Sequence, residues 1–156
     1  MVPFGAIISD RMASELQAVV EQLGGESAVG RSLRTEIDLQ TAIREGFPQS
    51  VVREVMAATG LTLRELAASL DLSARSLQRR RHEGRLAQYE SDRLYRLARI
   101  VALAKLYLGT ADVAMRWLRR PNRALGGLVP LAMIDMELGA RAVENVLGRI
   151  AYGGVS

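Results

Sequence analysis

Apolar residues recur at three- and four-residue spacing along most of this 156-residue chain, and glycine and proline fall between the periodic runs. Residues at these spacings share one face of a helix, so each run predicts an amphipathic helix with one side buried. No stretch of alternating β-branched residues indicates a strand. The pattern predicts an all-α protein, and a hydrophobic content of 49% is enough for a buried core.

Capping residues and helix breakers set the expected boundaries. We expect helices over residues 12–23, 37–45, 48–60, 62–71, 73–82, 91–108, 110–118, 130–138 and 140–150. Residues 26–37 fit either a linker or a short helix, and the glycine-containing tail after Ile150 does not favour helix. The helices divide into an N-terminal extension (1–46), a region with a helix-turn-helix and the long helix after it (47–108), and a C-terminal region (109–156).

Residues 62–82 have the layout of a helix-turn-helix. A capping box begins the first helix, and small Ala67 lets the second helix pack closely across it. Ser73 caps the second helix, and Leu77 is its expected buried anchor. The turn position usually held by glycine is Asp71, which tolerates the left-handed backbone conformation better than most residues.

The second helix is predicted to be a recognition helix that enters the major groove of DNA. Rotating about 100° per residue from Leu77 gives its exposed side, and arginine and glutamine there suit bidentate contacts with bases. With the cap Ser73, this exposed side consists of Ala74, Arg75, Gln78, Arg79 and His82. Phosphate contacts, which give affinity without sequence information, are predicted for Arg80, Arg81 and Arg85.

The net charge of +4 is concentrated in the same region. Residues 73–99 contain eight arginines and three acids, a net of +5, so the other 129 residues sum to −1. Two other readings remain open: an arginine-rich helix can be a solvated face, or it can bind an acidic protein as an adaptor. The coincidence of charge, cap and buried leucine favours operator DNA.

Composition excludes several kinds of catalytic and metal site. The chain has no cysteine and one histidine, His82, which leaves no cysteine or histidine-rich metal site and little room for triad chemistry. The only lysine, Lys105, follows alanine, so no phosphate-binding loop is present, and the dinucleotide fingerprint is missing too. We therefore expect no enzyme, no metal and no cofactor.

The chain also lacks the usual signs of membrane insertion or export. Its longest stretch without Asp, Glu, Lys or Arg is the run of eleven residues 124–134, short of the roughly 20 that span a bilayer. The first ten residues lack the basic start and long apolar run of a signal peptide. A cytoplasmic protein without a membrane partner is expected.

The 48 residues after Leu108 are too apolar to be a solvated tail. The last expected helix carries an apolar stripe that either completes an ordinary core or meets a partner. From the residues alone, Tyr152 is expected to fold back onto its own helix.

From Gln49 onward the chain resembles the Xre-type antitoxins, also called the MbcA/ParS/Xre family, of type II toxin–antitoxin systems. The resemblance covers about two-thirds of the chain and rests on four motifs in the family's order. These are SLQRRRHEGRL (76–86), SDRLYRLARI (91–100), WLRRPNRALGGLVPL (117–131) and GARAVENVLGRIAYG (139–153).

The resemblance implies an all-helical antitoxin that represses its own operon and whose C-terminal region neutralises a RES-domain toxin. Such toxins resemble ADP-ribosyltransferases and deplete NAD, and the antitoxin's C-terminal end reaches toward the toxin's active-site cleft. In this chain the corresponding residues are Arg149, Ile150, Tyr152, Gly153, Val155 and Ser156. Relatives commonly end in a Gly-Val-aromatic run, whereas this chain has an extra glycine and lacks the aromatic residue.

A plain helix-turn-helix transcriptional regulator, whose C-terminal region only dimerises or senses a ligand, is the alternative. Palindromic operators favour proteins with two-fold symmetry, so a homodimer is expected under either reading.

Overall fold

The computed structural model describes residues 1 and 3–153, and within them it contains helices and no β-strand, which confirms the all-α prediction. The α-helices are α1 (Phe4–Gln22), α2 (Gly25–Val29), α3 (Glu36–Glu45), α4 (Ser50–Thr59), α5 (Leu63–Ser69), α6 (Ala74–Glu83), α7 (Gln88–Leu108), α8 (Ala111–Leu118) and α9 (Glu137–Ala151). Two 3₁₀ turns, η1 (Arg123–Leu125) and η2 (Pro130–Met133), lie between α8 and α9.

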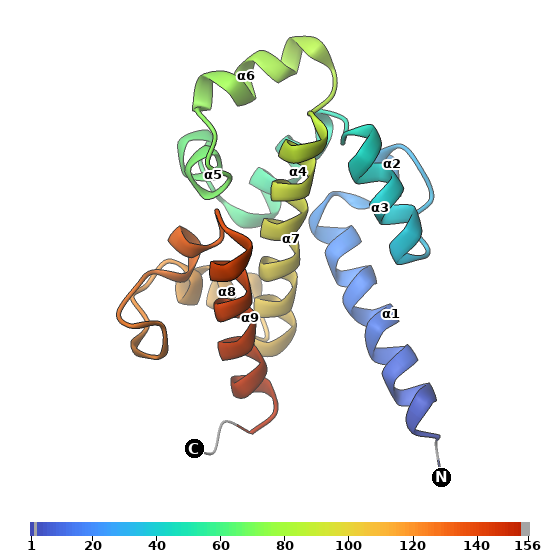
Figure 1. The fold of residues 1–156 in the computed structure, drawn as a ribbon, viewed down its shortest axis with the longest axis vertical. Coiled ribbons are helices and arrows are strands. Elements are labelled where there is room, and N and C mark those ends of the chain that lie inside the picture. The colour runs from blue at the N-terminus through green and yellow to red at the C-terminus, as the bar shows by residue number, and fades with distance from the viewer. Residues whose placement is uncertain (2, 154–156) are drawn as a thin grey trace.

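The long helix α7 runs through the middle of the protein (Figure 1). It packs against α1 and α3 on one side and against α8 and α9 on the other. Its residues Leu94, Leu97 and Ile100 are inaccessible to solvent, because α7 is covered from more than one direction. One continuous core therefore joins the N-terminal helices to the C-terminal ones.

Two helices begin earlier than the sequence pattern predicts. Helix α1 begins at Phe4 rather than at Met12, directly after Pro3. Helix α7 begins at Gln88 rather than near Ser91, because the Glu90 carboxylate accepts a hydrogen bond of 2.8 Å from the backbone N–H of Ala87. The ambiguous segment 26–37 contains all of the short helix α2 except its first residue, then a loop, and then the first two residues of α3.

The break predicted at Gly139 is wrong. Gly139 lies inside α9, and residues 130–133 form a 3₁₀ turn where a longer helix was predicted. A Cβ atom on Gly139 would lie 2.0 Å from the carbonyl oxygen of Met133. The glycine is therefore required for close approach of two backbones, and it does not end a helix.

Helix α6 lies at one end of the long axis of the protein, and the start of α1 and the end of α9 lie at the other (Figure 1). Helix α9 runs away from α6, towards the end where α1 begins (Figure 1). The predicted recognition helix and the C-terminal segment thus belong to separate surfaces. None of the helices in the described residues is long and apolar enough to cross a membrane.

Candidate functional site

Local hydrogen bonds begin both helices of the predicted helix-turn-helix. The Thr62 hydroxyl accepts from the backbone N–H of Glu65 at 3.2 Å, and the Glu65 carboxylate accepts from the N–H of Thr62 at 2.8 Å. This second bond is the main reason why the pKa of Glu65 is lowered. At α6, the Ser73 hydroxyl accepts from the N–H of Ser76 at 3.0 Å. The capping box and the serine cap are confirmed.

The turn between α5 and α6 is held from outside by α7. Asp71 has a φ of +51°, the left-handed conformation expected at this position. The guanidinium of Arg93 in α7 donates hydrogen bonds of 3.0 Å to the carbonyl oxygens of both Leu70 and Asp71. Because these bonds give hydrogen-bond donors to two carbonyls of the turn, Arg93 stabilises its strained backbone conformation.

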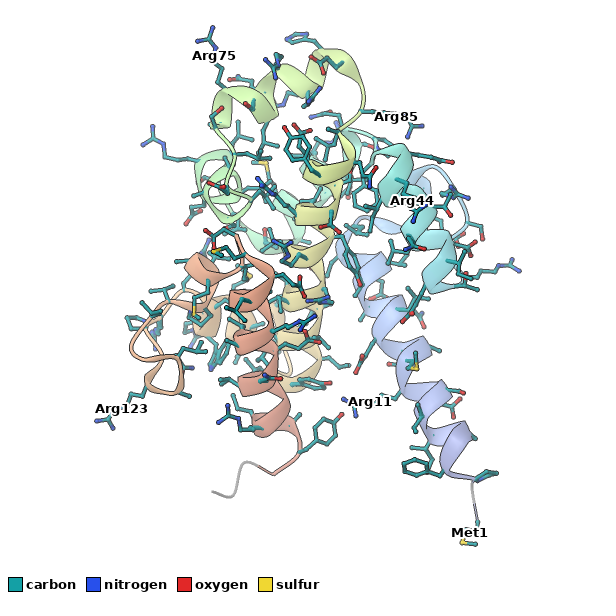
Figure 2. All side chains as sticks on the ribbon, in the orientation of Figure 1. Met1, Arg11, Arg44, Arg75, Arg85 and Arg123 are labelled. Carbon is teal, nitrogen blue, oxygen red and sulfur yellow. The ribbon has the colours of Figure 1, made fainter. Side chains whose placement is uncertain are left out.

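The outer side of α6 presents the predicted base-reading residues together. Leu77 is buried at 2% exposure, and the side chains on the opposite side are solvent-exposed. A shallow hollow on this side is lined by Ser73, Arg75, Ser76, Gln78, Arg79 and His82. Arg75 points outward at the N-terminal end of α6 (Figure 2). Ala74 is half-buried, because it packs against the core.

Arg80 does not have the exposed position expected of a phosphate ligand. Its Nε donates to both carboxylate oxygens of Glu90, at 3.0 and 3.1 Å, and its Nη1 donates to Glu83. Only 19% of the Arg80 side chain is exposed, and the two carboxylates raise its pKa. Arg80 therefore joins α6 to α7, and its charge is neutralised within the fold. The predicted phosphate contact instead requires a guanidinium that is free to face DNA.

Further arginines of the +5 segment also bind within the fold. Arg96 pairs with Glu137 at 3.0 Å and Arg99 with Glu144 at 3.4 Å, so both join α7 to α9. The four arginines of the segment that remain exposed are Arg75, Arg79, Arg81 and Arg85. The exposed arginines of this segment thus lie on α6 and, for Arg85, two residues after its end.

The segment after α6 is anchored to the loop before α4. The Leu86 N–H donates to the carbonyl of Phe47 at 2.9 Å, and the guanidinium of exposed Arg85 donates to the carbonyl of Gly46 at 2.8 Å. These bonds fix the C-terminal end of α6, as Ser73 fixes its beginning. The recognition helix is therefore oriented at both ends.

The predicted C-terminal segment lies at the opposite end of the protein. Arg149, Ile150, Tyr152 and Gly153 are all exposed, and 61% of Tyr152 is accessible to solvent. Val155 and Ser156, also predicted to contact a partner, lie outside the described residues. The structure thus brings four of the six predicted residues together at the end of α9.

Tyr152 packs against other helices rather than folding back onto α9. Its ring meets that of Tyr107 in α7 edge-on, with centroids 5.9 Å apart. The guanidinium carbon of Arg11 in α1 lies 4.4 Å from the centre of the Tyr152 ring. Arg11 and Tyr107 lie 141 and 45 positions before Tyr152 in the chain, so no local sequence signal could have revealed this contact.

No group of three or more His, Asp or Glu side chains within residues 1 and 3–153 could hold a metal ion.

A capped helix pair with an exposed arginine-bearing second helix defines a helix-turn-helix protein, here with a second helical unit built onto its long helix α7. Residues 38–99 match the family model "Antitoxin Xre-like helix-turn-helix domain". Residues 102–153 match "Antitoxin Xre/MbcA/ParS C-terminal toxin-binding domain". The chain belongs to the Xre antitoxin family and contains both of its domains.

Curated relatives agree with this assignment. The chain is 33% identical to Antitoxin Xre of Photorhabdus laumondii over 120 residues, which are 76% of this chain and 81% of the relative. It is 34% identical to Antitoxin Xre of Pseudomonas putida over 122 residues, 78% of this chain and 76% of the relative.

A solved structure shares the fold. The crystal structure of the Mycobacterium tuberculosis MbcT–MbcA toxin–antitoxin complex contains a chain with 28% sequence identity and a TM-score of 0.52. The match covers 69% of this chain and 96% of that chain. 

Proposed function

We propose that this antitoxin neutralises a cognate RES-domain, NAD-depleting toxin by direct binding and represses its own operon through α5 and α6, with no catalytic activity of its own. The observation that carries the proposal is the separation of two exposed surfaces, one on each family domain, at opposite ends of the protein. One molecule is thus able to hold DNA and a toxin at the same time. With operator DNA and an intracellular toxin as its proposed partners, the antitoxin is proposed to act in the cytoplasm.

The DNA-binding surface is proposed to be the outer side of α6. Arginine and glutamine side chains that share one exposed side fit base edges in the major groove. In this proposal Ser73, Arg75, Gln78, Arg79 and His82 face the bases, and Arg81 and Arg85 bind phosphates.

The toxin-binding surface is proposed to include the end of α9. Arg149, Ile150, Tyr152 and Gly153 offer an exposed cation, two apolar side chains and an unhindered backbone. An exposed cation and an exposed aromatic ring suit a cleft that binds an anionic dinucleotide. The relative in the MbcT–MbcA structure is one partner of a toxin–antitoxin complex, which supports a protein partner here.

Co-expression with the toxin encoded beside the antitoxin tests the central proposal. We expect co-purification of the two proteins and restored growth, and failure of both would refute a toxin partner. A chain lacking residues 152–156 is expected to lose neutralisation, whereas a plain regulator would keep its full function in the cell. The matched control is Arg79→Ala, which is expected to neutralise normally because α6 lies at the other end.

A homodimer is proposed on a separate observation. The first half of α1 exposes Phe4, Ile7, Ile8 and Met12, at 79, 55, 43 and 51%. Such an apolar stripe on a helix that projects beyond the core is typical of an interface. A second copy of this chain is the proposed occupant, because a helix-turn-helix that reads a palindromic site needs two-fold symmetry.

Light scattering after size-exclusion chromatography tests this interface. Ile8→Glu with Met12→Glu is expected to give a monomer. The control, Ala6→Glu with Ala13→Glu, adds the same charge to exposed positions about 100° or more around the same helix, and it is expected to remain dimeric. Identical masses for the two variants would contradict the proposed interface.

A further inference from the structure

Four side chains join the N-terminal helix to the end of the toxin-binding domain. Arg11 donates from Nη2 to the Tyr107 hydroxyl at 3.1 Å and from Nε to Glu15 at 3.1 Å. The Tyr107 hydroxyl in turn donates to Glu15 at 3.1 Å. The guanidinium, held by these bonds, lies with its carbon 4.4 Å from the centre of the Tyr152 ring.

The helix that supplies Arg11 lies outside both family-model matches, which cover residues 38–99 and 102–153. The second half of α1 and its C-cap residue are nonetheless part of the core, since Val19 and Leu23 are 5 and 0% exposed. This anchorage fixes the axis of α1 alongside α7. Arg11, about two to three turns further towards the N-terminus, points from α1 towards the end of α9 (Figure 2).

The contact between Arg11 and Tyr152 lies at the end of α9, so it can influence how this end of the helix is held. Tyr152 is the C-cap of α9, and its backbone N–H donates to the carbonyl of Gly148 at 2.9 Å. The next residue, Gly153, has a φ of +80° and leaves the helix direction. Arg11 and Tyr107 therefore contact the Tyr152 ring at the C-terminal end of α9.

We propose that Arg11 is a positioning residue for toxin binding: it holds Tyr152, and with it the end of α9, in the orientation that the toxin recognises. The inference rests on the proposed function and deepens it, because it assigns part of the toxin-binding surface to the N-terminal extension. Ordering this segment before the toxin arrives reduces the entropy lost on binding. An exposed cation–π contact has the strength to change affinity by about two- to fivefold.

The experiment is a double-mutant cycle with the purified full-length chain and its cognate toxin, with affinity measured by calorimetry. Arg11→Met, which keeps an unbranched apolar side chain but removes the charged guanidinium, is combined with Tyr152→Leu. Arg44→Met is the control, since Arg44 is an exposed arginine of α3 that makes no ion pair within the described residues. Hydrogen exchange at the Tyr152 amide is followed in the free chain.

We expect Arg11→Met to weaken toxin binding about two- to fivefold in the wild-type background and not at all in the Tyr152→Leu background. It is also expected to speed exchange at the Tyr152 amide, and Arg44→Met to change neither measurement. Equal effects in both backgrounds, unchanged affinity, or tighter binding by Arg11→Met would overturn the inference. Lack of binding by the wild-type chain would instead refute the proposed function, and the inference with it.

Discussion

The Nε atom of Arg80 in α6 lies 3.0 and 3.1 Å from the two carboxylate oxygens of Glu90 in α7. Glu90 is only 1% exposed, and it also accepts a hydrogen bond from the N–H of Ala87 at the start of α7. One carboxylate thus caps the central helix and ties the recognition helix to it. The orientation of α6 therefore depends on a buried charge as well as on the apolar anchor Leu77.

Replacing Glu90 by alanine is expected to destabilise the protein by about 3 kcal/mol, because it removes the cap and leaves Arg80 with one partner in a partly buried position. Urea unfolding measures this change. Glu83→Ala, which removes the more exposed partner of the same arginine, is the control and is expected to cost less than about 1 kcal/mol. Equal losses for the two variants would show that burial of Glu90 is unimportant.

Signals close together in the sequence predicted the helix-turn-helix well. Thr62, Glu65 and Ser73 act within three residues of their partners, so a single chain pattern is enough to place α5 and α6. The left-handed Asp71 was readable for the same reason, since turn geometry depends on the residue itself.

Long-range partners were not readable. Arg96 pairs with Glu137, which is 41 residues away, so the sequence alone could not show that α9 neutralises part of the charge of the +5 segment. The predicted helix break at Gly139 was wrong for a related reason. Glycine serves equally as a helix stop and as a point of close approach, and only the position of the Met133 carbonyl distinguishes the two.

Gly46 offers a test of the anchor behind α6. Its φ is +87°, and a Cβ atom there would lie 2.1 Å from the carbonyl oxygen of Leu86. Gly46→Ala is expected to destabilise the protein by more than about 2 kcal/mol, because a strained backbone conformation and a backbone clash add together. Gly60, with a φ of +70° and open space around it, is the matched control. Gly60→Ala is expected to cost about 1 kcal/mol in the same unfolding assay, and a similar loss at both sites would contradict the clash.

Stability is expected to fall at high pH through Tyr107. Burial, followed by the contact with Tyr152, raises its pKa to about 12, against about 10 in the unfolded chain. A raised acid pKa favours the protonated folded state, so this contribution is complete below pH 10 and is lost as the pH rises from 10 to 12. Unfolding free energies across this range measure the decline.

Tyr107→Phe is the control for the decline, because it removes the titrating group and keeps the ring. Part of the pH dependence is expected to remain, since burial also raises the pKa of Tyr95. An unchanged slope between pH 10 and 12 in the phenylalanine variant would show that Tyr107 does not titrate as described.

DNA-binding measurements on single variants are expected to distinguish arginines that recognise bases from arginines that bind phosphates. Arg79 lies among the residues that line the hollow on α6, so Arg79→Ala should lose about 1–3 kcal/mol of discrimination between the operator and altered sites. Arg81 is exposed outside that hollow, so Arg81→Ala should weaken binding to every sequence alike and lower the salt dependence by about one phosphate contact.

Titrations of operator and scrambled DNA at several salt concentrations distinguish these outcomes. Arg80→Ala is the informative third variant, because Arg80 is paired with Glu83 and Glu90 and should leave the salt dependence unchanged while lowering stability. If Arg80→Ala instead reduced the salt dependence as Arg81→Ala does, its ion pairs would have to open when DNA binds. The ion pairs of Arg80 would then be a feature of the free protein only, and the predicted phosphate contact of Arg80 would be restored.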